Sequence, residues 1–247
     1  MTLLAREDTT ATPPPQSLNH LLAVLPRSEF LALQPHLVTV QLAAKQRLAE
    51  PNQAIGFAYF PVDAVVSVVA AGEDDAMVEV ASVGCEGMAG VPLLFGSDRS
   101  IGRVVVQIAG TAERMDAAVL QREAARRDQF RRLLHLYTLG FLTQISQSTA
   151  CNRLHPAEQR LARWLLICRD RVGRDDLPIT HETMAMMLGV RRATVTEAAG
   201  ALQRAGMIRY RRGLVSIVDR KRLEAASCEC YGIVRAEFDR LLGVRVG

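Results

Sequence analysis

The spacing of apolar residues divides the chain into a β-rich stretch and a helical stretch. Between residues 38 and about 115, short β-type runs alternate with turn residues, as in an antiparallel sandwich or jelly roll. The expected strands are residues 39–42, 47–48, 57–60, 64–70, 77–83 and 102–108. The interior of such a β-roll either fills with side chains or holds a small ligand. Two small helices, separated by Pro26, are expected before it.

From residue 116 the apolar spacing becomes helical. A short helix is expected at residues 116–122 and a long one at 126–152. On the long helix, positions recur at alternating steps of four and three, the pattern of a seam for a partner helix. These positions are Phe130, Leu134, Tyr137, Phe141, Gln144 and Ser148. We favour this seam as a dimer interface; packing against the chain's own β-roll is the alternative, because the apolar part spans only two heptads.

Residues 180–212 have the spacing of a helix, a tight turn, a second helix and a basic hairpin. Thr180 can cap the first helix, and Met184 and Leu188 give it an apolar face. Gly189 supplies the left-handed backbone that ends this helix and allows a second one to begin after a sharp bend. The second helix has its own apolar stripe, made of Val195, Ala198, Ala199 and Leu202. This is the arrangement of a helix-turn-helix.

The polar side chains of this segment are candidates for DNA contact. The N-terminal residues of a recognition helix lie against base edges and phosphates in the major groove. The alternating stretch 207–218 around Gly213 is expected to form a hairpin wing. The expected DNA-binding residues are Thr180, Arg191, Arg192, Thr194, Thr196, Arg209, Arg211 and Arg212. The alternative is two ordinary packed helices followed by a solvated basic hairpin.

The distribution of charge favours DNA binding. The chain has 247 residues and a net charge of +4, but residues 1–150 carry −3 and residues 151–247 carry +7. Arginine dominates the basic half, and its planar fork suits phosphate and guanine. Double-stranded DNA is therefore the expected partner.

The N-terminal residues and the apolar runs predict a cytoplasmic protein. Residues 1–16 contain three consecutive prolines and are expected to be a disordered tail. Acidic residues and prolines stand there where a signal peptide has an apolar core. No run approaches the roughly 18 apolar residues of a membrane span, so no membrane contact is expected.

The cysteines and histidines predict no metal centre. Five cysteines are scattered and odd in number, which argues against a disulfide framework. Cys228 and Cys230 form one close-set pair without a second pair nearby, a weak metal signal, so incidental or structural roles are expected. The expected strands contain no histidine, whereas a cupin-like enzyme needs clustered His and Glu. We therefore expect no enzyme; the alternatives are a cupin-like enzyme or a small-molecule-binding jelly roll that does not bind DNA.

The order of elements resembles the Crp/Fnr family of bacterial transcription regulators over residues 17–225, most specifically at residues 188–195, LGVRRATV. The resemblance implies an α+β fold: an N-terminal β jelly roll of the cyclic-nucleotide-binding type, a long dimerisation helix and a C-terminal winged helix-turn-helix. The implied domains are a β-roll sensor at 17–125, a dimerisation helix at 126–152 and a DNA-binding domain at 153–247. It also implies a homodimer on a palindromic site, an effector sensed by the β-roll, and RNA polymerase as a partner.

The recognition helix departs from the family pattern at two positions. Ala193 and Glu197 stand where the family commonly has glutamate and arginine, whereas Arg192 keeps the place of the guanine-contacting arginine. DNA binding is therefore expected, but the target need not be the family's consensus.

The sensor departs further. Cyclic-nucleotide binders of the family have an acidic residue at the place of Val91, followed by an arginine and a serine, which here match Arg99 and Ser100. Arg99 and Ser100 are the expected effector-binding residues, and a cyclic nucleotide is retained as an alternative although Val91 offers the ribose no acceptor. No other cofactor is expected, because no cysteine precedes Cys85 to hold an iron–sulfur cluster.

Overall fold

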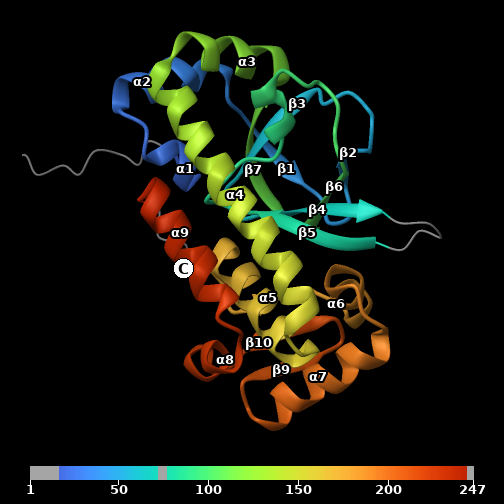
Figure 1. Cartoon of the computed structure of the whole chain (residues 1–247). Helices are drawn as coiled ribbons and strands as arrows, with labels where there is room; N and C mark the ends of the chain where they lie inside the picture. Colours follow the sequence, from blue (N-terminus) through green and yellow to red (C-terminus); the bar gives the residue numbers. More distant parts are fainter. Residues whose placement is uncertain (1–16, 72–76, 244–247) are drawn as a thin grey trace, which may run out of the picture.

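A computed structural model describes residues 17–71 and 77–243; the expected disordered tail at residues 1–16 lies outside the described residues. Figure 1 shows a β-roll connected by one long helix to a helical part that carries a small sheet. The helices are α1 (His20–Ala23), α2 (Arg27–Leu33), α3 (Ala117–Arg126), α4 (Asp128–Leu154), α5 (Ala157–Val172), α6 (His181–Leu188), α7 (Arg192–Arg204), α8 (Arg220–Ala226) and α9 (Cys230–Leu242). The strands are β1 (Val38–Leu42), β2 (Arg47–Ala49), β3 (Phe57–Pro61), β4 (Val65–Ala71), β5 (Met77–Val83), β6 (Arg103–Ile108), β7 (Gly110–Asp116), β8 (Asp176–Leu177), β9 (Ile208–Arg211) and β10 (Leu214–Ile217).

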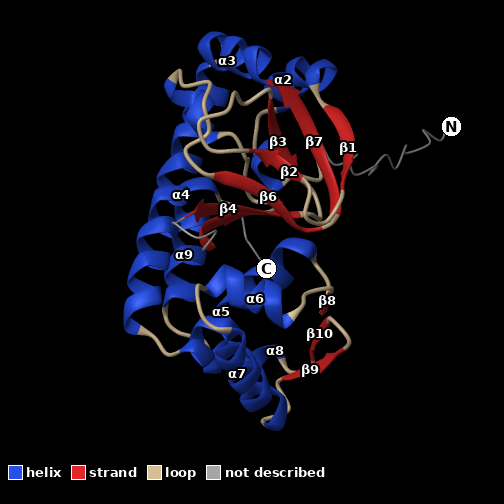
Figure 2. Ribbon diagram, turned by 90° about the vertical axis from the view of Figure 1, so that its right-hand side faces the viewer, coloured by secondary structure: helices blue, strands red, loops and turns tan. Residues whose placement is uncertain are grey.

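Two antiparallel sheets form the β-roll. One has the strand order β2-β6-β4-β5 and the other β1-β7-β3. The expected strands are all present, but β7 was missed, because its charged residues Glu113 and Arg114 lower its intrinsic strand propensity. Pairing on both sides, with β1 and β3, compensates for this. Figure 2 shows both sheets on the side of the molecule away from α9.

The long helix α4 packs against the C-terminal helix α9, which runs beside it (Figure 1). Phe238 of α9 lies against Gly140, with its ring 6.2 Å from that of Tyr137. Val234, Phe238 and Leu242 join the same hydrophobic core as the β-roll. Thus α9, which the sequence places in the C-terminal domain at 153–247, shares the core of the β-roll. Within the described residues, no helix has the combination of length and apolarity needed to cross a bilayer.

The expected dimer seam on α4 faces the inside of the chain. All of its members are buried by the β-roll and α9: Phe130, Leu134, Tyr137, Phe141, Gln144 and Ser148. Tyr137 donates a hydrogen bond to the Met88 carbonyl, and the Gln144 amide donates to the Ser82 carbonyl. The assignment of these residues to a partner surface is therefore corrected: they fill the chain's own core, which was the alternative. A partner helix can reach only the opposite face of α4.

The β-roll and the helical part meet through a shared apolar core and a buried ion pair. Arg171, in the last turn of α5, contacts Glu86 at 2.7 Å, and both side chains are almost completely buried. Burial alone would lower the pKa of Arg171, but the adjacent Glu86 carboxylate stabilises the charged form, and the pKa of Arg171 lies above its ordinary value. Arg171 also donates to the Ser82 hydroxyl. A β-carbon on Gly84 would lie only 2.3–2.5 Å from the Arg171 side chain, so glycine is required there.

We expect Glu86→Gln to lower the free energy of unfolding by about 3 kcal/mol, because it leaves a buried guanidinium without a counter-charge. Urea denaturation followed by circular dichroism measures the loss. Glu237→Gln is the matched control: Glu237 forms a surface ion pair with Arg240, whose side chain is 64% exposed, and the loss of this pair should leave the midpoint nearly unchanged. Equal midpoints for the two variants would contradict the role given to Glu86.

Candidate nucleic-acid interface

Helices α6 and α7 form the expected helix-turn-helix. The Thr180 hydroxyl accepts a hydrogen bond from the Thr183 backbone N–H and caps α6, which ends at Gly189 with φ of 61°. After the turn, α7 begins at Arg192 with Arg191 as its N-cap. The apolar stripes of both helices are buried in a second core. This packing leaves the first turn of α7 exposed.

Strands β9 and β10 form the expected wing, joined by a tight turn. Arg212 and Gly213 both have positive φ, 49° and 79°, as the two central residues of a type I′ hairpin require. β8 extends the sheet on the other side of β10. Tyr210 donates its backbone N–H to the Gln203 side chain at 2.7 Å, which ties the free edge of β9 to the recognition helix.

The structure brings the predicted DNA-binding residues to the surface of α7 and the wing. Arg191, Arg192 and Thr196 are exposed at the start of α7, whereas Thr194 is only half-exposed. Arg209, Arg211 and Arg212 are exposed on the wing, and Thr180 is an exposed capping residue. The exposed side chains at the start of α7 and along the wing form the candidate interface.

Two residues of this surface were missed by the sequence analysis. The His181 ring stacks on Tyr210 with ring centres 4.0 Å apart and lies 3.2 Å from the Thr196 hydroxyl. It thereby connects α6, α7 and the wing. Burial and the neighbouring positive charge of Arg192 lower the pKa of His181, so the imidazole is neutral at neutral pH. The sequence could have indicated His181, because it directly follows the capping residue Thr180 at the start of α6.

A cavity lies between the β-roll and α4. Its volume is about 290 Å³, and its wall is almost entirely apolar, including Val68, Met88, Val104 and Phe141. The described residues that line it include no charged side chain. Its polar groups are few, among them the Thr138 hydroxyl from α4. The arrangement suits a small apolar molecule, since a charged ligand would have no counter-charge inside.

The expected effector residues are separated by the structure. Ser100 lines the cavity, but its hydroxyl donates to the Gly102 carbonyl. Arg99 does not line it; its guanidinium donates to the Asn52 carbonyl at 2.6 Å on the exposed surface. The geometry of the pair is therefore not that of a phosphate clamp inside the cavity.

The outward face of α4 carries an unpartnered seam, which we call the outer seam. Its positions recur at steps of three and four, and all are exposed: Arg132, His135, Leu139, Leu142, Ser146, Thr149 and Arg153. Leu139 and Leu142 are about half-exposed, and Phe95, 67% exposed, lies beside them. Exposed Leu139, Leu142 and Phe95 thus form a small apolar patch among polar positions, and such a patch suits a contact with another chain.

Comparison with known proteins identifies both the domain and the fold. Residues 159–226 match the family of Crp-like helix-turn-helix domains. No curated protein matches the chain. FixK2 from Bradyrhizobium japonicum has a similar structure, with a TM-score of 0.66 and 16% identity over 78% of this chain and 98% of that one.

Two further solved structures resemble the chain. TTHB099, a CRP-family transcriptional regulator from Thermus thermophilus, gives a TM-score of 0.61 and 17% identity over 84% of this chain and 98% of that one. The c-di-GMP-responsive regulator CLP of Xanthomonas campestris gives a TM-score of 0.61 and 14% identity over 78% of this chain and 99% of that one. At such identities the likeness concerns the fold, and it confirms the expected order of β-roll, long helix and winged helix-turn-helix.

Proposed function

We propose that this DNA-binding transcriptional regulator of the Crp/Fnr type binds a palindromic site as a homodimer and responds to a small apolar molecule in its β-roll cavity. The observation that carries DNA binding is the surface shared by α7 and the wing, within a domain that is Crp-like. Five arginines are exposed there: Arg191, Arg192, Arg209, Arg211 and Arg212. The protein acts in the cytoplasm, where its promoter-bound form contacts RNA polymerase.

The two groups of arginines have different roles in this proposal. Arg192, in the first turn of α7, enters the major groove and reads a base edge, for which its bidentate fork is suited. Arg209 and Arg211 alternate along β9 and therefore project from one face of the wing, where they contact phosphates. His181, which stacks on Tyr210 and lies against Thr196, fixes the position of the wing relative to α7.

The homodimer forms through the outer seam. Two copies of α4 pack with Leu139 and Leu142 at the centre, and Phe95 is covered at the side. This contact replaces the inward seam that the sequence suggested, and it leaves the intrachain packing of α9 intact. A two-fold axis along α4 presents two recognition helices to the half-sites of a palindrome, about one DNA turn apart.

The effector reaches α4 directly. Thr138, Phe141 and Leu142 of α4 line the cavity, and Leu142 also belongs to the outer seam. A bound molecule therefore contacts the helix that carries the dimer interface. If the ligand binds one arrangement of this helix more tightly than another, its binding is coupled to DNA binding.

We expect Arg192→Ala and Arg211→Ala to impair DNA binding in different ways. Arg192→Ala should reduce the binding free energy on the cognate site by about 1–3 kcal/mol and relax the sequence preference at one base pair. Arg211→Ala should weaken binding to all DNA sequences alike, and it should reduce the slope of log K against log salt concentration by about 1. Gel-shift titrations at two salt concentrations measure both, with Arg240→Ala on α9 as the control. Binding that is indifferent to both substitutions would exclude this interface.

We expect Leu139→Asp to dissociate the homodimer, because it places two carboxylates in an apolar contact. Sedimentation analysis should show the mass falling from twice to once the 27.1 kDa of a single chain. Leu31→Asp is the control: Leu31 is 51% exposed, as Leu139 is 47%, but it lies on α2. A dimer that survives Leu139→Asp would place the interface elsewhere.

We expect small apolar molecules, but not cyclic AMP, to raise the melting temperature. Indole is a suitable probe because it fits a cavity of about 290 Å³ without burying a charge. Thermal shift assays should give a rise of a few degrees, roughly what 1–2 kcal/mol of binding provides in a chain of this size. Val104→Phe fills the cavity and should abolish the rise. A rise with cyclic AMP that disappears in Arg99→Ala would instead restore the cyclic-nucleotide alternative.

A further inference from the structure

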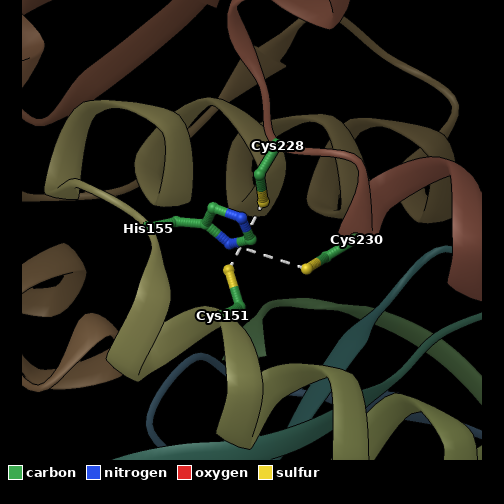
Figure 3. A group of neighbouring side chains, drawn as sticks. All are labelled: Cys151, His155, Cys228 and Cys230. Carbon is green, nitrogen blue, oxygen red and sulfur yellow. Dashed lines mark hydrogen bonds between the residues drawn. The ribbon is translucent and has the colours of Figure 1, made fainter.

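Four metal-binding side chains converge at the junction of α4 and α5. Figure 3 shows Cys151, His155, Cys228 and Cys230 pointing toward one another, and their donor atoms all lie within 4.8 Å of each other. Cys151 Sγ is 3.4 Å from Cys228 Sγ, and His155 Nδ1 is 3.7 Å from Cys230 Sγ. All three cysteines are free and buried. The fold thus supplies, in Cys151 and His155, the second pair that Cys228 and Cys230 lack in the sequence.

Local structure places each pair of donors. Cys151 lies in the last turn of α4 and His155 caps its C-terminus, so their spacing of four puts both on one face. Cys228 lies between α8 and α9, and Cys230 is the first residue of α9. The antiparallel packing of α9 on α4 brings the two pairs together.

The histidine is oriented as a ligand by a neighbouring carboxylate. His155 Nε2 lies 3.1 Å from the Glu229 carboxylate, while Nδ1 faces the thiols. A proton held on Nε2 by Glu229 leaves the Nδ1 lone pair free for a metal. Metal-bound histidines in proteins commonly have such a carboxylate partner.

The charge of the surroundings also fits a metal-thiolate centre. Arg163 of α5 is only 6% exposed, and its Nε and Nη1 atoms are buried without a hydrogen-bond partner. It lies close enough for its charge to act on all three thiols. Three thiolates and one divalent metal ion carry a net charge of −1. The positive charge of Arg163 would help to balance that charge, and so would that of Arg160, which is also buried and acts on Cys151 and Cys228.

We propose that Cys151, His155, Cys228 and Cys230 bind one zinc ion in a closed tetrahedral site. Sulfur atoms at about 2.3 Å from zinc are separated by about 3.8 Å along a tetrahedral edge, close to the distances between these donors. An iron–sulfur cluster places its ligands on different iron atoms and needs a wider set. With four protein donors there is no position for substrate water, so the site is structural.

The zinc ion links the start of α9 to the junction of α4 and α5. His155 lies at this junction, immediately before Pro156. Further along α9, Val234, Phe238 and Leu242 belong to the core of the β-roll domain, so loss of the metal removes one of the two attachments of α9.

The test is the metal content of the full chain, purified under reducing conditions without chelator. Mass spectrometry of the digested protein should find close to one zinc per chain. Replacement by Co²⁺ should produce thiolate charge-transfer bands and the intense d–d bands of a tetrahedral site. Cys230→Ser should lose the metal, whereas Cys85→Ala, a buried cysteine outside the group, should retain it. His155→Cys should retain Co²⁺ with a shifted spectrum, because it keeps four donors.

A second variant separates ligation from folding. Glu229 has a side chain that is 68% exposed, so Glu229→Gln should fold normally yet bind zinc about 10–100-fold more weakly in a competition with a chelating dye. Reduced wild-type chain that is folded and binds neither zinc nor cobalt would overturn the proposal. So would iron with acid-labile sulfide, or a Cys151–Cys228 disulfide in the purified protein with no metal uptake after reduction.

Discussion

The relation between the two domains depends on the buried ion pair between Arg171 and Glu86. The cost of taking this guanidinium out of water is offset because Glu86, the Ser82 hydroxyl and the Gln144 side chain accept its hydrogen bonds. The absence of a β-carbon at Gly84 gives the Arg171 side chain its space. An intermediate position, with the charges buried but apart, is strongly disfavoured. The ion pair therefore favours one position of α5 on the β-roll, in addition to the apolar core that Val65 and Val69 share with Trp164.

The fold could largely be predicted because its main signals are local. The cap at Thr180 and the left-handed glycine at Gly189 define the helix-turn-helix within a few residues of sequence. Strand β7 could not be predicted in this way, because neighbours on both sides stabilise it against its own propensity. The prediction of a dimer interface at Phe130, Leu134, Tyr137 and Phe141 on α4 was wrong for a related reason. Steps of three and four occur on both faces, and spacing shows that a face is apolar without showing whether the chain itself covers it.

The sites were less predictable than the fold, because they depend on contacts between distant segments. Cys151 and Cys228 are 77 positions apart, and only the return of α9 brings them together. The spacing of four between Cys151 and His155 was a usable signal, since it places two ligands on one helix face. In the sensor, Arg99 matched an anion-binding motif in sequence, yet its loop directs the side chain to the Asn52 carbonyl. Motif spacing does not specify where a loop side chain points.

Because Val234, Phe238 and Leu242 belong to the sensor core, the N-terminal domain is completed by the last part of the described chain. During synthesis the β-roll and α4 leave the ribosome long before α9 does, so the N-terminal domain cannot complete its core as an early, independent unit. Until then Tyr137 and Phe141 lack the contact with Phe238 and the rest of α9, although the β-roll side of both residues can already pack. The core of the N-terminal domain is thus completed only after the helix-turn-helix has been made.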